Sequence, residues 1–149
     1  MMTILVLNGP NLSLLGVREP AIYGATTLVD VERACSEAGA RLGLRVDFRQ
    51  TNHEGVLIDA LHEAQLGFKD GTVAGVVLNA GAYSHTSIAL HDAMKGVEVP
   101  VIEVHLSNIH AREPFRHHSM LSPAAAGIIV GLGKLGYVLA IEAIAARRA

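Results

Sequence analysis

The chain has 149 residues, which is enough for one domain with a sizeable core. Its formal net charge of −2 argues against nucleic acid as the main partner, and no apolar run approaches the roughly 20 residues that a membrane span needs. Half of the residues are hydrophobic and the mean hydropathy is +0.36, which favours a homo-oligomer with apolar faces between subunits; a fully covered parallel sheet would raise the apolar fraction as well.

Strand-like and helix-like segments alternate along the chain. Short apolar runs predict strands at 3–7, 44–51, 73–78, 100–104 and 125–130. Helical patterns occupy 27–42, 54–68, 86–94 and 134–148, and 108–123 is expected to be irregular with one helical turn near 111–115. This alternation predicts a single domain over 1–149, an α/β fold of the flavodoxin-like doubly wound type. We expect a five-stranded parallel sheet of order 2-1-3-4-5 with helices on both faces.

Three of these apolar runs end abruptly in polar side chains. Asn8 and Asn11 follow the first, Asn79 to His85 follow the third, and Glu103 to Asn108 follow the fourth. Ligands in open α/β sheets bind beyond the carboxyl ends of the strands, so we expect these groups to form one site. The segment 79–85 has two interpretations: a helix entry capped near Ser84 or His85, or an anion receptor made of amides and a helix N-terminus.

Glu103 and His105 are two residues apart on the same strand and therefore lie on one face. This spacing suits a carboxylate that holds an imidazole in one tautomer, or a structural ion pair at the strand end. The irregular segment that follows contains Arg112 and Arg116, a composition that suits binding an anion.

Residues 13–25 are too long for an ordinary connection and contain glycine near both ends, as lids over active sites often do. Arg18 and Tyr23 lie in this segment. A tyrosine beside an arginine can have its pKa lowered and act as a base, or the tyrosine can simply pack while the arginine faces solvent.

Two other patterns are discounted. Residues 131–136 match the dinucleotide fingerprint, but no strand or acidic residue follows at the required distance, so close packing of a helix on a strand is the better interpretation. The histidines between 105 and 118 lack a metal-ligand spacing, so we expect no metal. The single cysteine, Cys35, is predicted to be a small buried hydrophobe; it excludes an intramolecular disulfide and favours a cytoplasmic protein.

Over its whole length the chain resembles the type II 3-dehydroquinate dehydratases. The resemblance rests on several motifs in the right order: Leu7-Asn8-Gly9-Pro10-Asn11-Leu12, Arg18-Glu19-Pro20, Ile22-Tyr23-Gly24, Asn79-Ala80-Gly81, His85-Thr86-Ser87, Glu103-Val104-His105-Leu106-Ser107-Asn108, Arg112-Glu113, Phe115-Arg116-His117-His118-Ser119, Gly131-Leu132-Gly133 and Gly136-Tyr137.

The resemblance implies a hydro-lyase of the shikimate pathway that converts 3-dehydroquinate reversibly to 3-dehydroshikimate, by anti elimination through an enolate and without a cofactor. It implies that Tyr23 is the base for the C2 proton, assisted by Arg18, and that His105 is the general acid for the C1 hydroxyl. Glu103 would orient His105, and Asn11 would help stabilise the enolate. The substrate-binding positions would be Asn79, Gly81, His85, Asp92, Leu106, Ser107, Arg112 and Arg116.

The resemblance also implies a dodecamer built from trimers, which would account for the apolar composition. The chain departs from the family pattern at Ser13, Ser84 and Met120, none of which is a proposed catalytic residue. A flavodoxin-like binding or signalling module is the alternative function. A phosphoacceptor module would need paired carboxylates after the first strand, where this chain has Asn8 and Asn11, and a flavin carrier would need aromatic walls, but the chain has no tryptophan.

Overall fold

The structure, a computed structural model, describes residues 1–17, 21 and 24–148. Its centre is a five-stranded parallel sheet of order β2-β1-β3-β4-β5, which confirms the predicted fold class and strand order. The strands are β1 (Thr3–Asn8), β2 (Arg45–Gln50), β3 (Val73–Asn79), β4 (Val101–His105) and β5 (Gly127–Val130). All the observed strands overlap the predicted ones.

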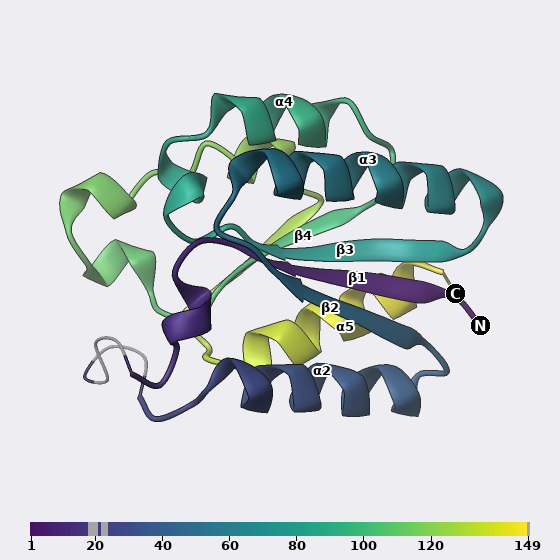
Figure 1. Ribbon diagram of the computed structural model, residues 1–149, viewed down its shortest axis with the longest axis horizontal. Helices are drawn as coiled ribbons and strands as arrows, with labels where there is room; N and C mark the ends of the chain where they lie inside the picture. The colour runs from purple at the N-terminus through teal and green to yellow at the C-terminus, as the bar shows by residue number, and fades with distance from the viewer. Residues whose placement is uncertain (18–20, 22–23, 149) are drawn as a thin grey trace.

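Two helices cover each face of the sheet (Figure 1). One face carries α3 (Glu54–Asp70) and α4 (Ile88–Lys95), and the other carries α2 (Leu28–Arg41) and α5 (Leu135–Arg147). Helix α2 begins at a capping box, in which Thr27 and Asp30 each accept a hydrogen bond from the other's backbone N–H. The predicted start of this helix at Thr27 is therefore confirmed.

The alternation of side chains along β1 divides the core in two. Leu5 and Leu7 pack with the residues of α3 and α4, whereas Ile4 and Val6 pack with those of α2 and α5. Cys35 is fully buried among the α2 and α5 residues, and burial, together with the nearby Glu32, raises the pKa of its thiol to about 12. The thiol is therefore an inert part of the core, as predicted.

Two details differ from the sequence expectations. Residues 81–85 form a 3₁₀ turn, and α4 begins only at Ile88, where Ser87 accepts a hydrogen bond from the Leu90 N–H. The cap is therefore Ser87, and neither Ser84 nor His85. The irregular segment after β4 contains three 3₁₀ turns where one helical turn was predicted: Ile109–Ala111, Pro114–Arg116 and Ser122–Ala124.

Candidate active site

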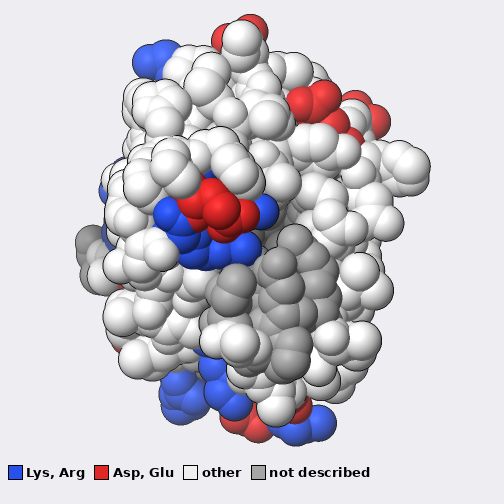
Figure 2. Space-filling model, turned by 90° about the vertical axis from the view of Figure 1, so that its left-hand side faces the viewer, with Lys and Arg blue, Asp and Glu red and all other residues white. Residues whose placement is uncertain are grey.

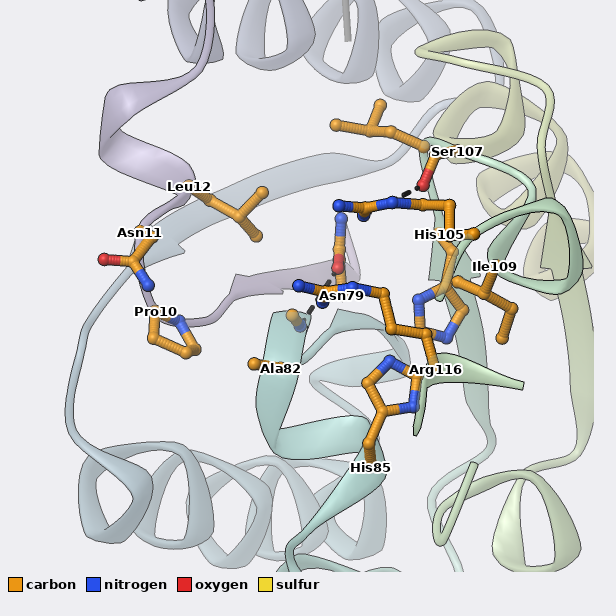
Figure 3. A pocket seen from close by; sticks show the side chains of 13 residues that line it. Pro10, Asn11, Leu12, Asn79, Ala82, His85, His105, Ser107, Ile109 and Arg116 are labelled. Atoms are coloured by element: carbon orange, nitrogen blue, oxygen red, sulfur yellow. Dashed lines mark hydrogen bonds between the residues drawn. The ribbon is translucent and has the colours of Figure 1, made fainter. Parts of the chain in front are cut away.

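A pocket opens beyond the carboxyl ends of β1, β3 and β4, where the three polar clusters of the sequence converge (Figure 3). Its walls come from the segment after β1, the turn after β3 and the segment after β4. The lining residues are Pro10, Asn11, Leu12, Asn79, Gly81, Ala82, His85, His105, Leu106, Ser107, Ile109, Arg112 and Arg116.

Nine of the predicted site residues line this pocket: Asn11, Asn79, Gly81, His85, His105, Leu106, Ser107, Arg112 and Arg116. Glu103 lies behind His105 with no exposed surface. Asp92 is exposed on α4 and does not line the pocket, so its binding role stays a prediction. Arg18, Tyr23 and much of the predicted lid lie outside the described residues.

Four lining residues were not selected from the sequence: Pro10, Leu12, Ala82 and Ile109. All are apolar and lie next to, or close to, a polar residue that was selected. Their position beside the chemically informative residues was the only available signal, because apolar side chains carry no pattern that separates a pocket wall from the core.

The most strongly constrained group in the pocket is His105. Its Nε2 lies 2.5 Å from Oε2 of Glu103, at the end of β4. Glu103 also accepts hydrogen bonds from the hydroxyls of Ser119 and Ser122, each at 2.7 Å. Burial alone would raise the pKa of this carboxyl, but the hydrogen bonds that it accepts from His105 and the two serines lower it below its ordinary value of 4.5.

An ionised carboxylate can only accept hydrogen bonds, so the Nε2 of His105 carries a proton. Its other ring nitrogen, Nδ1, is thereby left for a group in the pocket. This arrangement suits an imidazole that exchanges a proton with a ligand. The sequence prediction that Glu103 and His105 pair is confirmed.

A second imidazole lies against the first. The rings of His85 and His105 are stacked with their centroids 6.2 Å apart, and Nδ1 of His85 donates to the carbonyl oxygen of His118 at 2.9 Å. This bond leaves Nε2 of His85 as an acceptor in the neutral ring. Burial, opposed by the hydrogen bond to His118, lowers the pKa of His85, so the ring is neutral at pH 7 and accepts hydrogen bonds from a hydroxylated ligand.

Two guanidinium groups supply positive charge at the pocket. Arg116 donates from Nε to Oε1 of Glu113 at 3.2 Å, and Arg112 lies 3.6 Å from the same carboxylate. Figure 2 shows basic and acidic side chains side by side on this end of the molecule. Arg112 also donates from Nη1 to Oγ of Ser107 at 3.5 Å. Both arginines line the pocket, and the planar guanidinium group suits the binding of an anionic ligand.

On the opposite face of the sheet, a neutral hydrogen-bonded cluster supports the pocket. The hydroxyl of Tyr137, in α5, donates to Oδ1 of Asn8 at 2.7 Å and accepts from Nδ2 of Asn79 at 2.8 Å. Oδ1 of Asn79 accepts from the Gly81 N–H at 3.1 Å, which orients the side-chain amide. Asn79 therefore reaches the pocket from a fixed position.

The glycine-rich segment 131–136 has a structural role at this site. The N–H groups of Gly131 and Gly133 donate to the carbonyls of His105 and Leu106 at 3.1 and 3.0 Å. Both glycines have positive φ, and Gly136 is buried so closely that an added Cβ would lie 3.2 Å from Ile129. Close packing of helix and strand is thus the reason for the motif, as the sequence indicated.

The arrangement fits acid–base chemistry on a hydroxylated anion. It combines an imidazole held by a buried carboxylate, neutral hydrogen-bonding groups and two cations around one pocket. Within the described part of the chain, no cluster of three or more His, Cys, Asp or Glu side chains could hold a metal ion, and no helix is long and apolar enough to cross a membrane.

Comparisons with known proteins agree with this chemistry. The sequence profile of the family described as dehydroquinase class II matches residues 2–145. The chain is 67% identical over 144 residues to a 3-dehydroquinate dehydratase of Marinomonas sp. (strain MWYL1), covering 97% of this chain and 96% of that protein. It is also 67% identical over 144 residues to a 3-dehydroquinate dehydratase of Variovorax paradoxus (strain S110), and the match covers 97% of this chain and 99% of that protein. The crystal structure of type II dehydroquinase from Propionibacterium acnes superimposes with a TM-score of 0.90 at 49% identity, covering 98% of this chain and 97% of that one.

Proposed function

The chain belongs to the class II dehydroquinase family and dehydrates 3-dehydroquinate, and we propose that it does so by anti elimination through an enolate intermediate. The reaction makes it a hydro-lyase of the shikimate pathway. Overall, C2 of the substrate loses a proton and C1 loses its hydroxyl as water, which leaves the conjugated enone 3-dehydroshikimate. No comparison favours the alternative of a binding or signalling module.

The observation that carries this proposal is the buried Glu103–His105 pair at the pocket. In the elimination step Nδ1 of His105 gives a proton to the C1 oxygen as the C1–O bond breaks. Before this step His105 is an imidazolium, which the negative charge of Glu103, 2.5 Å from Nε2, stabilises. The resulting neutral imidazole keeps its proton on Nε2, which still donates to the carboxylate, so no proton needs to enter the buried cluster.

The remaining roles follow from the family and the pocket. Tyr23, assisted by Arg18, takes the C2 proton, and residues 13–25 close over the bound substrate. Asn11 stabilises the enolate. The substrate hydroxyls and carboxylate are held by Asn79, Gly81, His85, Asp92, Leu106, Ser107, Arg112 and Arg116, of which all but Asp92 line the pocket. The chemistry proceeds without a cofactor, because the ketone itself accepts the electrons of the broken C2–H bond.

We further propose that the enzyme is cytoplasmic and assembles into a dodecamer built from trimers. The single buried cysteine is consistent with a reducing compartment. Several large apolar side chains are exposed on the single chain, including Leu66 and Phe115, whose relative exposures are 70% and 67%. Burial of such residues between subunits would account for the apolar composition.

The deciding experiment mixes the purified protein with 3-dehydroquinate, without added metal or cofactor, and follows the ultraviolet absorbance of the enone product. We expect prompt turnover in the wild type. His105→Ala and Tyr23→Phe should each lower kcat by roughly 10²–10⁴-fold, the usual contribution of one acid or base. His110→Ala, which removes an exposed histidine of the same segment that does not line the pocket, should keep the wild-type rate.

No turnover by the folded and assembled protein would overturn the function. Turnover that survives in Tyr23→Phe would place the base elsewhere, whereas turnover that survives in His105→Ala would remove His105 from the reaction.

A further inference from the structure

Two serine hydroxyls contact the carboxylate behind His105, although neither serine lines the pocket. Oγ of Ser119 lies 2.7 Å from Oε2 of Glu103, and Oγ of Ser122 lies 2.7 Å from Oε1. The two hydroxyls therefore hold different oxygens of the same carboxylate. These bonds fix the orientation of the carboxylate plane. A hydrogen bond from His105 alone would leave the carboxylate free to rotate.

The direction of the Ser119 hydroxyl follows from its other partners. Its oxygen accepts from the backbone N–H groups of Leu121 at 3.1 Å and Ser122 at 3.3 Å. Both lone pairs are then engaged, so its single proton points to Glu103. Ser119 is thus a committed donor to the carboxylate.

The segment that carries these serines is itself fastened to the other side of the pocket. The Met120 N–H donates to the Ser84 carbonyl at 2.7 Å, Nδ1 of His91 bonds to the Met120 carbonyl at 2.7 Å, and His85 bonds to the carbonyl of His118. The residues on both sides of Ser119 are therefore fixed by the 3₁₀ turn after β3 and by α4. The hydroxyls are held in place before any substrate binds.

Among the described residues, few charged groups lie near Glu103, so neutral hydrogen-bond donors are needed to stabilise its ionised carboxylate. The ionisable groups that act on this site are His105 on the same strand, His85 stacked against that ring, and Arg116 near His85. Of these ionisable groups, His105 alone forms a hydrogen bond with the carboxylate. A fully buried carboxylate needs several donors to remain ionised, and here two of three are serines.

We propose that Ser119 and Ser122 are positioning residues for the dehydration: they keep the Glu103 carboxylate ionised and fixed in one orientation, which holds the acidic proton of His105 toward the substrate. This inference depends on the role of His105 as general acid proposed above. The serines act through Glu103 and His105 and do not touch the substrate.

The first test is Ser122→Ala, because within the described part of the chain this hydroxyl is hydrogen-bonded only to Glu103. Loss of a hydrogen bond to a charged group should lower kcat about tenfold, with KM changed by less than about twofold. Ser119→Ala should lower kcat at least as much, and the double variant should lower it further. Ser122→Thr retains the hydroxyl and should restore most of the rate.

A pH profile separates positioning from general damage. Donors to a carboxylate favour its ionised form, so their removal should raise the pKa of Glu103. The acidic limb of kcat should therefore move to higher pH in Ser122→Ala and further in the double variant. A purely structural serine would lower stability and leave this limb where it is.

Ser84→Ala is the matched control. Ser84 is also fully buried next to the same segment, but its hydroxyl has no hydrogen-bond partner among the described residues. Its removal should leave kcat and the acidic limb unchanged. If Ser122→Ala and Ser119→Ala behave like Ser84→Ala, or lose rate with an unmoved limb, the inference is overturned while the function stands. A wild-type protein without turnover would overturn both.

Discussion

The two faces of the sheet bury polar groups beside the same pocket in opposite ways. On the α3–α4 face, an anionic cluster joins Glu103 to His105, Ser119 and Ser122. On the α2–α5 face, a neutral cluster joins Tyr137 to Asn8 and Asn79. Both lie at the carboxyl ends of the strands, and both reach the pocket through one side chain.

The two clusters differ in charge and therefore in their suitability for proton transfer. In the anionic cluster a buried carboxylate accepts hydrogen bonds from three described donors, and one of them is the imidazole of His105, which lines the pocket. In the neutral cluster every group keeps its proton over the ordinary pH range, because burial raises the pKa of Tyr137 well above its usual value of 10.0. The first is suited to chemistry, whereas the second only fixes the position of Asn79.

Glu103→Gln should have the largest effect, because it removes the charge from the anionic cluster. The glutamine NH₂ cannot accept hydrogen bonds, so at least one present donor loses its acceptor. We expect kcat to fall by roughly 10²–10⁴-fold, measured with the enone absorbance assay. Glu142→Gln, which changes an exposed carboxylate on α5, is the control and should retain full activity. A Glu103→Gln enzyme with a near-normal rate would remove the functional distinction between the clusters.

Tyr137→Phe should affect stability more than catalysis, because it opens the neutral cluster. Asn8 loses a donor and Asn79 loses an acceptor, and each buried group left unsatisfied costs roughly 1–3 kcal/mol. Urea unfolding at a fixed protein concentration measures this loss. Tyr83→Phe removes a more exposed hydrogen bond to the Asn52 carbonyl and should cost less. If the two variants had equal free energies of unfolding, the buried cluster would contribute no more to stability than the exposed hydrogen bond of Tyr83.

The smallest expected effects lie in the pH dependence of stability, where the clusters act at opposite ends. The folded-state pKa of Glu103 is lowered, so its contribution is present above pH 4.5 and is lost as the pH falls through the folded value. The folded-state pKa of Tyr137 is raised, so its contribution is present below pH 10.0 and is lost as the pH rises above it.

Unfolding free energies of the wild type, Glu103→Gln and Tyr137→Phe across pH test this assignment. Glu103→Gln should flatten only the acidic side of the wild-type curve, and Tyr137→Phe only the alkaline side. Ion pairs elsewhere, such as Arg49 with Asp47 and Glu63, also act at low pH but are common to all three proteins. A variant that flattens the wrong side would contradict the pKa shift assigned to its residue.

Local sequence patterns were sufficient to predict the sheet and, within the anionic cluster, the pairing of Glu103 with His105. The apolar runs predicted the strands and their order, and the spacing of Glu103 and His105 placed both on one face because side chains alternate along a strand. The helical pattern over 27–42 also predicted the start of α2, where the structure has a capping box contained in the four residues 27–30.

Contacts between distant segments could not be predicted in this way. Ser119 and Ser122 are 16 and 19 residues from Glu103, across an irregular segment with no period to follow. The hydroxyl of Tyr137 meets Asn8 across 129 residues. The family resemblance implied a binding role for Asp92, but this residue lies on α4 and does not line the pocket. A resemblance in sequence does not show where a residue lies relative to the pocket.

The burial of Cys35 has a practical consequence for labelling. Its thiol lies on the buried face of α2 and has a pKa of about 12, so maleimide reagents at neutral pH should leave it unmodified. A cysteine introduced on the surface, for example by Val17→Cys at a position that is 82% exposed, would then be the single reactive thiol of the chain. A fluorescent reporter can therefore be attached within the segment 13–25 without first replacing the native cysteine.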